Sequence, residues 1–280
     1  MFEQWINGFL VYISDEKNLK RSSAEAYISD IRAFQEYLHS LRLNEPVEVN
    51  DTEVIRYILS LQRSKKNSST IARHLSSIRC FFQYLRDEGV VKTDPTKNLK
   101  PPRKERRCPS VLTEGQMMNL MDMPSDKSEK GARDKAILGL MYGTGLRVSE
   151  IIGLKIKDVD IKGRSVNTKD RLVPVEQELL ESLKRYIDEY RKDEEPGSPL
   201  FTNSRGTNLT RQGLWKIVKS YSRTTNPQNI RNSFAVHMLS NGEQPGRVGQ
   251  LLGHSDPSSI HALIELVDSA QRDSGGRARQ

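Results

Sequence analysis

Three short segments in the second half of the 280-residue sequence combine a glycine-containing or polar turn with arginine or histidine. Arg147 follows a Gly-Thr-Gly turn in "YGTGLRVSE", Arg231 stands near the predicted start of a helix in "NPQNIRNSF", and His254 belongs to the turn "LLGHS". A guanidinium binds phosphate oxygens in a planar fork, and an imidazole transfers protons near neutral pH. Taken singly, such residues are more often ordinary turn, surface or structural residues. Their chemistry therefore depends on the elements that bring them together.

The first 88 residues are predicted to form four helices. Ser22 with Glu25 has the pattern of a capping box at the start of the second helix. The fourth helix begins near Ser69, and Gly89 is placed to end it in a left-handed conformation. Its apolar face is formed by Ile71, Leu75, Ile78, Phe82 and Leu85. Residues 1–88 are therefore predicted to be a small helical domain.

The second domain is predicted to span residues 111–280, after a basic, proline-rich linker at residues 89–110. Thr113 and Gln116 supply a capping box just after that linker. Residues 164–175, "RSVNTKDRLVPV", alternate in the manner of a β-hairpin or small sheet, and the remainder has helical spacing. The expected fold is mainly α with a small β-sheet.

The charge balance favours an anionic partner. Lysine and arginine outnumber aspartate and glutamate by 44 to 36, and nucleic acid is the commonest partner of such a chain. Arg73, His74 and Arg79 lie off the apolar face of the fourth helix and are predicted to be free to meet solvent or phosphate. The residues predicted to bind DNA are Lys65, Lys66, Arg73, His74, Arg79, Arg103, Lys104, Arg106 and Arg107.

Several other classes of protein are disfavoured. Cys80 and Cys108 fit no metal-ligand spacing, so no metal site is predicted. No apolar run approaches the ~20 residues that a membrane helix needs. The first residues lack the pattern of a signal peptide. The sequence thus predicts a cytoplasmic protein with no membrane partner.

In this order, "GTGLRVSEI", "RLVPV", "NIRNSF" and "LLGHS" resemble the tyrosine recombinase (phage integrase) family, and its Xer-type members in particular. The resemblance covers nearly the whole chain. It implies a helical core-binding (SAM-like) N-terminal domain and a catalytic-type α+β C-terminal domain. In that family a tyrosine hydroxyl attacks a DNA phosphodiester and forms a 3′-phosphotyrosyl link. Two arginines stabilise the phosphate, histidines and a hairpin lysine assist proton transfer, and no metal or nucleotide cofactor is needed.

The family's residues carry over only in part. Arg147 and Arg231 match the two arginines, and His254 matches the downstream histidine. Gln228 stands where the family has histidine; it can donate a hydrogen bond but cannot act as an acid or base. The hairpin is shorter than the Xer form, and Lys169 is the nearest candidate for its lysine.

The nucleophile is the largest departure from the family. Xer-type sequences place the tyrosine nine residues after the histidine of "LGHS", where this chain has Leu263. All nine tyrosines lie at or before Tyr221. Ser258, Ser259 and His261 carry nucleophilic atoms, but the serines are expected in the first turn of a helix and His261 on its surface. Leu263 itself belongs to an apolar stripe, which predicts that it packs against the protein.

The resemblance, with these departures, implies a sequence-specific binder of double-stranded DNA that does not cut it by itself. Such a protein could be a repressor, an architectural factor or a non-cleaving partner in a recombinase tetramer, as a homo-oligomer or a hetero-oligomer with an intact recombinase. The alternative is an active recombinase whose nucleophile is an unusual residue or comes from another subunit. A remnant without function is a third reading, and the preserved caps and helix stripes speak against it.

Overall fold

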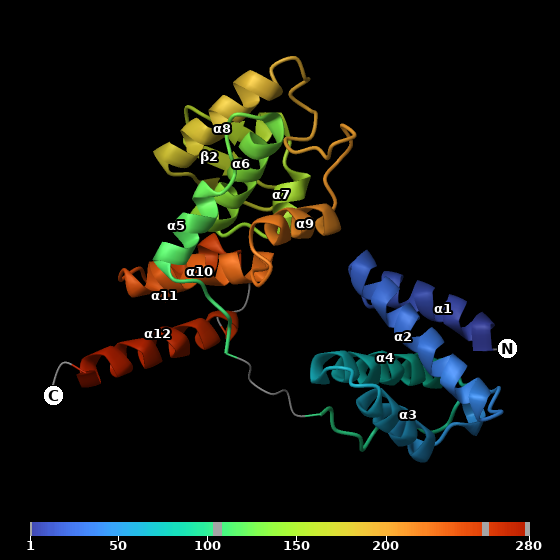
Figure 1. Cartoon of the computed structure of the whole chain (residues 1–280). Helices are drawn as coiled ribbons and strands as arrows, with labels where there is room; N and C mark the ends of the chain where they lie inside the picture. The colour runs from blue at the N-terminus through green and yellow to red at the C-terminus, as the bar shows by residue number, and fades with distance from the viewer. Residues whose placement is uncertain (1, 103–107, 254–257, 278–280) are drawn as a thin grey trace. The chain divides into compact units, whose positions relative to one another are not determined.

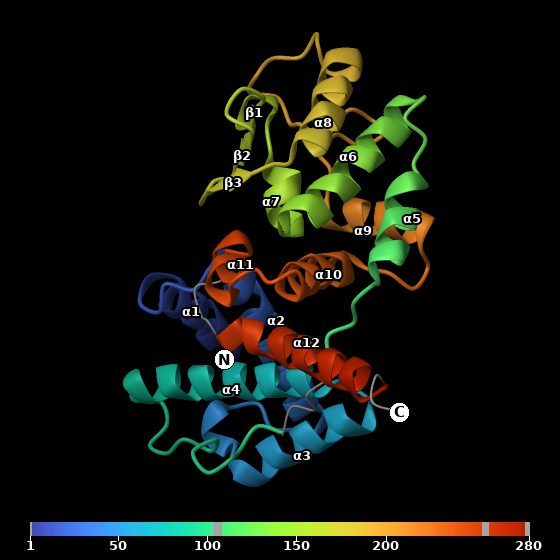
Figure 2. The same cartoon turned by 90° about the vertical axis from the view of Figure 1, so that its left-hand side faces the viewer.

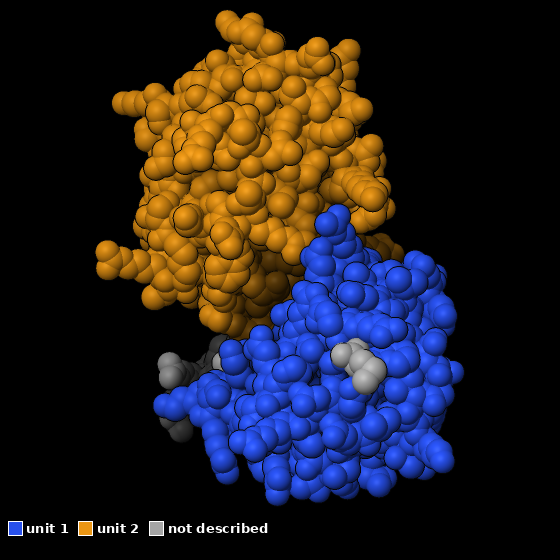
Figure 3. All heavy atoms as spheres, turned by 90° about the vertical axis from the view of Figure 1, so that its right-hand side faces the viewer, with its two compact units in different colours: residues 1–106 blue, residues 107–280 orange. Residues whose placement is uncertain are grey.

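The computed structural model describes residues 2–102, 108–253 and 258–277, and the chain divides into two compact units, residues 1–106 and 107–280. Figure 1 labels the elements along the chain, and Figure 3 colours the two units separately. The fold is mainly helical with one small sheet, as the sequence predicts. Within the described residues no helix is long and apolar enough to cross a membrane.

Unit 1 contains the four helices that the apolar spacing predicts. They are α1 (Phe2–Asp15), α2 (Arg21–Ser40), α3 (Asp51–Arg63) and α4 (Ser68–Asp87), with a 3-10 turn at Pro46–Glu48. The side chains of Phe2, Phe9, Phe34, Phe81 and Phe82 are fully buried in its core. Two residues of the predicted linker, Val91 and Leu99, also pack against this core.

The ends of these helices follow from local residues, with one exception. Asn50 and Asn67 cap α3 and α4 with their side chains, and Gly89 adopts a φ of 72° just beyond α4. The predicted capping box of Ser22 and Glu25 is wrong. Helix α2 begins one residue earlier, at Arg21, and the carboxylate of Glu25 accepts a hydrogen bond from Arg21 instead.

Unit 2 contains eight α-helices and three short strands in its described residues. The elements are α5 (Glu114–Asp122), α6 (Glu129–Thr144), α7 (Val148–Gly153), a 3-10 turn (Ile156–Asp158), β1 (Val159–Asp160), β2 (Ser165–Asn167), β3 (Leu172–Pro174), α8 (Gln177–Tyr190), α9 (Arg211–Tyr221), α10 (Pro227–Ser240), α11 (Pro245–Leu251) and α12 (Ser258–Arg277). The strands form an antiparallel sheet in the order β1-β2-β3, with Val166 opposite Val173. The predicted capping box of Thr113 and Gln116 is confirmed at the start of α5.

Two apolar clusters hold unit 2 together. The larger joins α5–α9 and the sheet through residues such as Ile137, Leu140 and Leu183. The smaller joins α10, α11 and α12, which Figure 2 shows near one another. Helix α12 thus packs on the helix that carries Arg231.

Candidate phosphate-binding site

The Gly-Thr-Gly turn places Arg147 at the start of α7. Gly145 ends α6 with a φ of 61°, and a Cβ there would lie 2.5 Å from the ring of Phe234. The turn therefore needs glycine for both its backbone conformation and its packing. Arg147 follows as the N-cap residue of α7, with its side chain 42 % exposed. Its Nη2 atom donates a hydrogen bond to the carbonyl of Gly253.

Glu150 is the carboxylate at the centre of this site. It accepts hydrogen bonds from the backbone N–H of Arg147 and from Nε and Nη2 of Arg171, the latter two at 3.1 and 3.0 Å. One of its oxygens also lies 4.0 Å from Nη1 of Arg231. Glu150 is 9 % exposed, so its charge is screened little by water and it balances the surrounding guanidiniums. We call Arg147, Glu150, Arg171 and Arg231 the arginine site.

Arg231 is the buried member of the arginine site. Its Nη1 and Nη2 atoms donate to the carbonyls of Gly145 and Leu252, and its side chain is 7 % exposed. Burial, with the charges of Arg147 and Arg171, lowers the pKa of Arg231 to about 10, and Glu150 opposes the shift. The guanidinium still carries its charge at neutral pH.

Arg171 connects the hairpin to the end of α11. Its Nη1 atom donates to the carbonyls of Gln250 and Leu251. Gly253 has a φ of 61°, and a Cβ there would lie 2.9 Å from Nε of Arg171 and 3.0 Å from Nη1 of Arg147. The left-handed backbone therefore favours glycine at this turn, and a side chain there would also displace the two guanidiniums. His254 itself lies outside the described residues.

Leu263 lies where the resemblance expects the nucleophile. It is 6 % exposed and packs in the cluster of α10, α11 and α12, which confirms its predicted place in an apolar stripe. It borders a hollow of about 370 Å³ that Gln228 and Arg231 also line. Gln228 is exposed, and its Nε2 atom donates to Asn232 at 2.8 Å. The chain therefore offers a leucine and a glutamine beside the buried arginine.

Lys169 lies in the turn between β2 and β3 and is exposed. It borders a separate hollow of about 290 Å³ that Ser149, Glu150 and Asp158 also line. Within the described part of the chain its side chain makes no hydrogen bond or ion pair. Its contact with phosphate stays a prediction. Among the residues that the structure describes, no three histidine, cysteine, aspartate or glutamate side chains come together in a group that could hold a metal ion.

The residues predicted to bind DNA in unit 1 differ in their environments. Lys65, Lys66 and Arg73 are exposed. His74 is 7 % exposed, so the prediction that it is free to meet solvent is wrong. Asp30 and Tyr57, from two other helices, give it polar partners inside the core.

Arg79 also differs from that expectation. Its Nη2 atom donates to the carbonyls of Thr96 and Leu99, which ties part of the linker to α4. Four predicted DNA contacts lie outside the described residues: Arg103, Lys104, Arg106 and Arg107.

Two features of unit 2 were missed by the sequence analysis. Arg171 and Glu150 lie within the motifs "RLVPV" and "GTGLRVSE", but nothing in their spacing shows that they meet. The second feature is a stretch without acidic residues: residues 196–242 contain no aspartate or glutamate, which can be read directly from the sequence. Within that stretch α9 exposes Trp215, at 43 %, beside basic residues. The exposed basic residues of the stretch are Arg205, Arg211, Lys216, Lys219 and Arg223.

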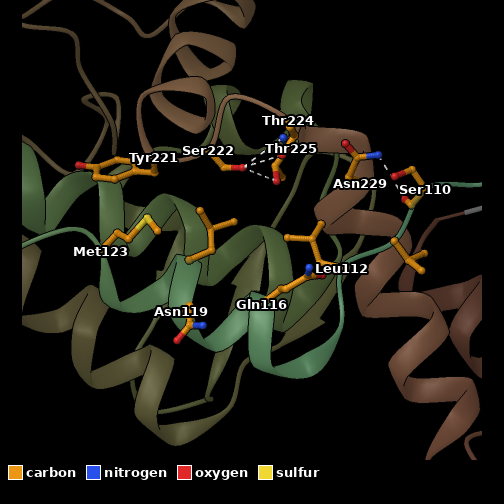
Figure 4. Close-up of a pocket in the computed structure, with 12 residues that line it drawn as sticks. Ser110, Leu112, Gln116, Asn119, Met123, Tyr221, Ser222, Thr224, Thr225 and Asn229 are labelled. Carbon is orange, nitrogen blue, oxygen red and sulfur yellow. Dashed lines mark hydrogen bonds between the residues drawn. The ribbon is translucent and has the colours of Figure 1, made fainter.

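A third hollow, of about 370 Å³, lies between α5, the connection from α9 to α10 and Ser110–Leu112 (Figure 4). The residues at its rim form hydrogen bonds through hydroxyl, amide and carbonyl groups. The amide of Asn229 donates to the carbonyl of Ser110, and Ser222 donates to Thr225. No charged side chain lines it, so it is distinct in chemistry from the arginine site.

Comparisons with known proteins place the chain among tyrosine recombinases. The chain is 36 % identical over 277 residues to the tyrosine recombinase XerC of Roseiflexus castenholzii, covering 93 % of this chain and 88 % of the relative. It is 31 % identical over 289 residues to XerD of Oceanobacillus iheyensis, covering 98 % and 97 %. The XerH site-specific recombinase bound to its palindromic difH substrate has the same fold, with a TM-score of 0.75 and 16 % identity over 94 % of this chain and 82 % of that one.

Two family models cover most of the sequence. The N-terminal SAM-like domain of phage integrases matches residues 6–89, and the phage integrase family matches residues 110–265. The arginine site, Gln228 and Leu263 all lie within the second match. With both units matched in order, the chain belongs to the phage integrase family of tyrosine recombinases.

Proposed function

We propose that this protein binds specific double-stranded DNA through its recombinase fold and does not cleave that DNA by itself. The observation that carries the proposal is Leu263, which is buried beside Arg231 where the family's attacking hydroxyl is expected. A leucine side chain has no atom that can attack a phosphodiester. The family match continues to residue 265, so position 263 lies within the region of likeness.

DNA binding is supported by the groups that remain. Arg147 is 42 % exposed and held by the carbonyl of Gly253, so it can offer further N–H groups to a phosphate oxygen. Arg231 and Arg171 add positive charge behind it. XerH, a relative in fold, is described bound to its DNA substrate. Binding and cleavage thus depend on different groups: the arginines remain, while the nucleophile and one histidine are replaced, by Leu263 and Gln228.

The acid-free stretch of unit 2 supports a second area of contact. Residues 196–242 contain no aspartate or glutamate, so the exposed basic residues on and beside α9 cannot pair with a carboxylate from the same stretch. Trp215 presents an apolar surface among them. Such a surface suits a phosphate backbone, whose binding weakens as salt rises.

A protein of this kind would act as a repressor, an architectural factor or a non-cleaving subunit beside an intact recombinase. The last role is favoured by the arginine site, because phosphate-binding residues remain useful in a subunit that only holds DNA. Genome-wide mapping of bound DNA separates the roles. Binding at promoters supports a repressor, and binding beside recombination sites supports the partner role.

The direct test uses the purified chain and a duplex selected by it from a randomised library. Mobility shift measures binding to that duplex. The same duplex, nicked near its centre, traps any covalent intermediate, which is read as a protein–DNA species stable in detergent. The Arg147→Gln variant is the control for dependence on the arginine site, and it is expected to weaken binding. Tight binding without a covalent species supports the proposal, and a covalent species from the wild-type chain contradicts it.

A further inference from the structure

A buried carboxylate in unit 1 collects three polar side chains of α4. Asp30 of α2 is 2 % exposed. Its Oδ2 atom accepts a hydrogen bond from Ser77 at 2.9 Å, and its Oδ1 atom lies 3.0 Å from Nη2 of Arg73. The Nε2 atom of His74 lies 3.3 Å from the same Oδ1. A buried charge of this kind costs stability unless it is paired and hydrogen-bonded, and here it is both.

The surroundings of His74 determine its protonation. An ionised Asp30 can only accept, so Nε2 carries the proton toward it, and Nδ1 accepts from the hydroxyl of Tyr57 at 3.1 Å. Burial lowers the pKa of His74; the charge of Asp30 opposes this, and the charges of Arg73 and Lys66 add to it. His74 is therefore neutral at neutral pH, which leaves Arg73 as the cation that balances Asp30.

Arg73 differs from its two buried neighbours because it reaches the surface. Its side chain is 44 % exposed although Nη2 is fixed by a carboxylate that is almost fully buried. Lys66 is exposed, and its charge acts on the same histidine, so a second cation lies in the same region. An arginine fixed at one nitrogen loses less conformational freedom when its other N–H groups bind a ligand.

We propose that Asp30 is a positioning residue that holds Arg73 in the conformation in which Arg73 contacts DNA. The inference rests on the proposed DNA binding and assigns unit 1 one specific contact and its support. Ser77 orients the carboxylate from its other oxygen, and His74 fixes it from the core side. A surface arginine without such support, such as Arg32, which pairs with Glu3 at 54 % and 55 % exposure, would not share this role.

The test compares variants of the full chain on the library-selected duplex. Arg73→Gln is expected to weaken binding about tenfold and to lower the slope of log affinity against log salt by about 1, the effect of one lost phosphate contact. Arg73→Lys should bind DNA nearly as weakly as Arg73→Gln, because an ammonium lacks the planar set of N–H donors that lets one guanidinium hydrogen-bond Asp30 and DNA together. Arg32→Gln is the matched control and should bind as the wild type does.

Asp30→Asn tests the positioning role. This variant is expected to weaken DNA binding as much as Arg73→Gln does. The double variant should bind DNA as tightly as Arg73→Gln alone, because both changes remove the same contact. Thermal unfolding checks that each variant folds. If Asp30→Asn does not fold, Ser77→Ala replaces it and should lower affinity and salt slope in the same direction.

Two results would overturn the inference. One is Arg73→Gln binding as the wild type does. The other is additive losses in the double variant, which would mean that Asp30 supports the fold rather than Arg73. Either leaves the wild-type affinity for the duplex, and with it the proposed function, intact. A wild-type chain that binds no duplex would instead contradict both this inference and the proposed function.

Discussion

The guanidinium of Arg171 donates hydrogen bonds to both carboxylate oxygens of Glu150, across 21 residues of sequence: Nε lies 3.1 Å and Nη2 3.0 Å from Oε1, and Nη2 lies 3.2 Å from Oε2. Arg171 is 16 % exposed and Glu150 9 %, so water replaces little of this interaction if it is lost. The pair joins α7 to the hairpin, and Arg171 continues to the end of α11. The arginine site is therefore both a candidate phosphate site and a junction of three elements.

Removing the charge of Glu150 should destabilise unit 2. We expect Glu150→Gln to lower the free energy of unfolding by about 2–3 kcal/mol, because the nearby guanidiniums lose their buried counter-charge. Urea unfolding of the full chain measures the effect. Asp188→Asn is the control: it breaks an exposed pair with Lys184, which water screens, and should lower the free energy of unfolding far less. Equal costs for the two variants would contradict this role of Glu150.

A tyrosine at position 263 should restore part of the missing chemistry. Leu263 borders the hollow beside Arg231, so the Leu263→Tyr variant can extend its hydroxyl into that space. We expect a slow covalent species with the nicked duplex from Leu263→Tyr and none from the matched Leu263→Phe. Gln228→His added to Leu263→Tyr should raise the rate, because histidine can transfer a proton. Failure of both tyrosine variants would mean that more than the nucleophile has been lost.

The exposed face of α9 should contribute to the salt dependence of DNA binding. We expect Arg211→Gln to lower the slope of log affinity against log salt by about 1, with a similar loss on every DNA sequence. Fluorescence anisotropy over a salt series measures this. Lys184→Gln on α8 removes a cation that pairs with Asp188 and should leave the slope unchanged. An unchanged slope for Arg211→Gln would exclude Arg211 as a phosphate contact.

His74 should make the stability of unit 1 dependent on pH. Its folded pKa lies below the ordinary 6.5, so the folded state binds its proton less readily than the unfolded chain does. The contribution of His74 to the free energy of unfolding is therefore complete above pH 6.5. As the pH falls below 6.5, the free energy of unfolding decreases by at most about 1.4 kcal/mol for each pH unit. Urea unfolding on both sides of that pH should show the fall in the wild type and a smaller one in His74→Gln. His39→Gln, at an exposed site, should behave as the wild type does.

Much of the fold follows from local patterns in the sequence. The apolar spacing along α4, the capping box at Thr113 and the alternation in residues 164–175 each predict the element that is found. These signals are local, so they need no knowledge of distant residues. The placement of Leu263 could be predicted for the same reason, since Ile260 and Val267 lie at helical spacing from it.

The missed features depend on partners far apart in the chain. His74 lies beside the apolar stripe of α4, and only contacts with α2 and α3 show that a histidine can be buried there. Arg171 resembles any hairpin arginine until α7 and α11 bring Glu150 and Leu251 to it. Spacing along the sequence reports which face of an element is apolar. It does not report which polar groups another element supplies.

The nicked selected duplex, incubated with the unmodified chain, shows whether this protein can form a covalent link to DNA. We predict a stable, salt-sensitive complex that separates fully into protein and DNA in detergent. A covalent protein–DNA species, mapped by mass spectrometry to any residue of this chain, would mean that the protein cuts DNA and does not merely hold it.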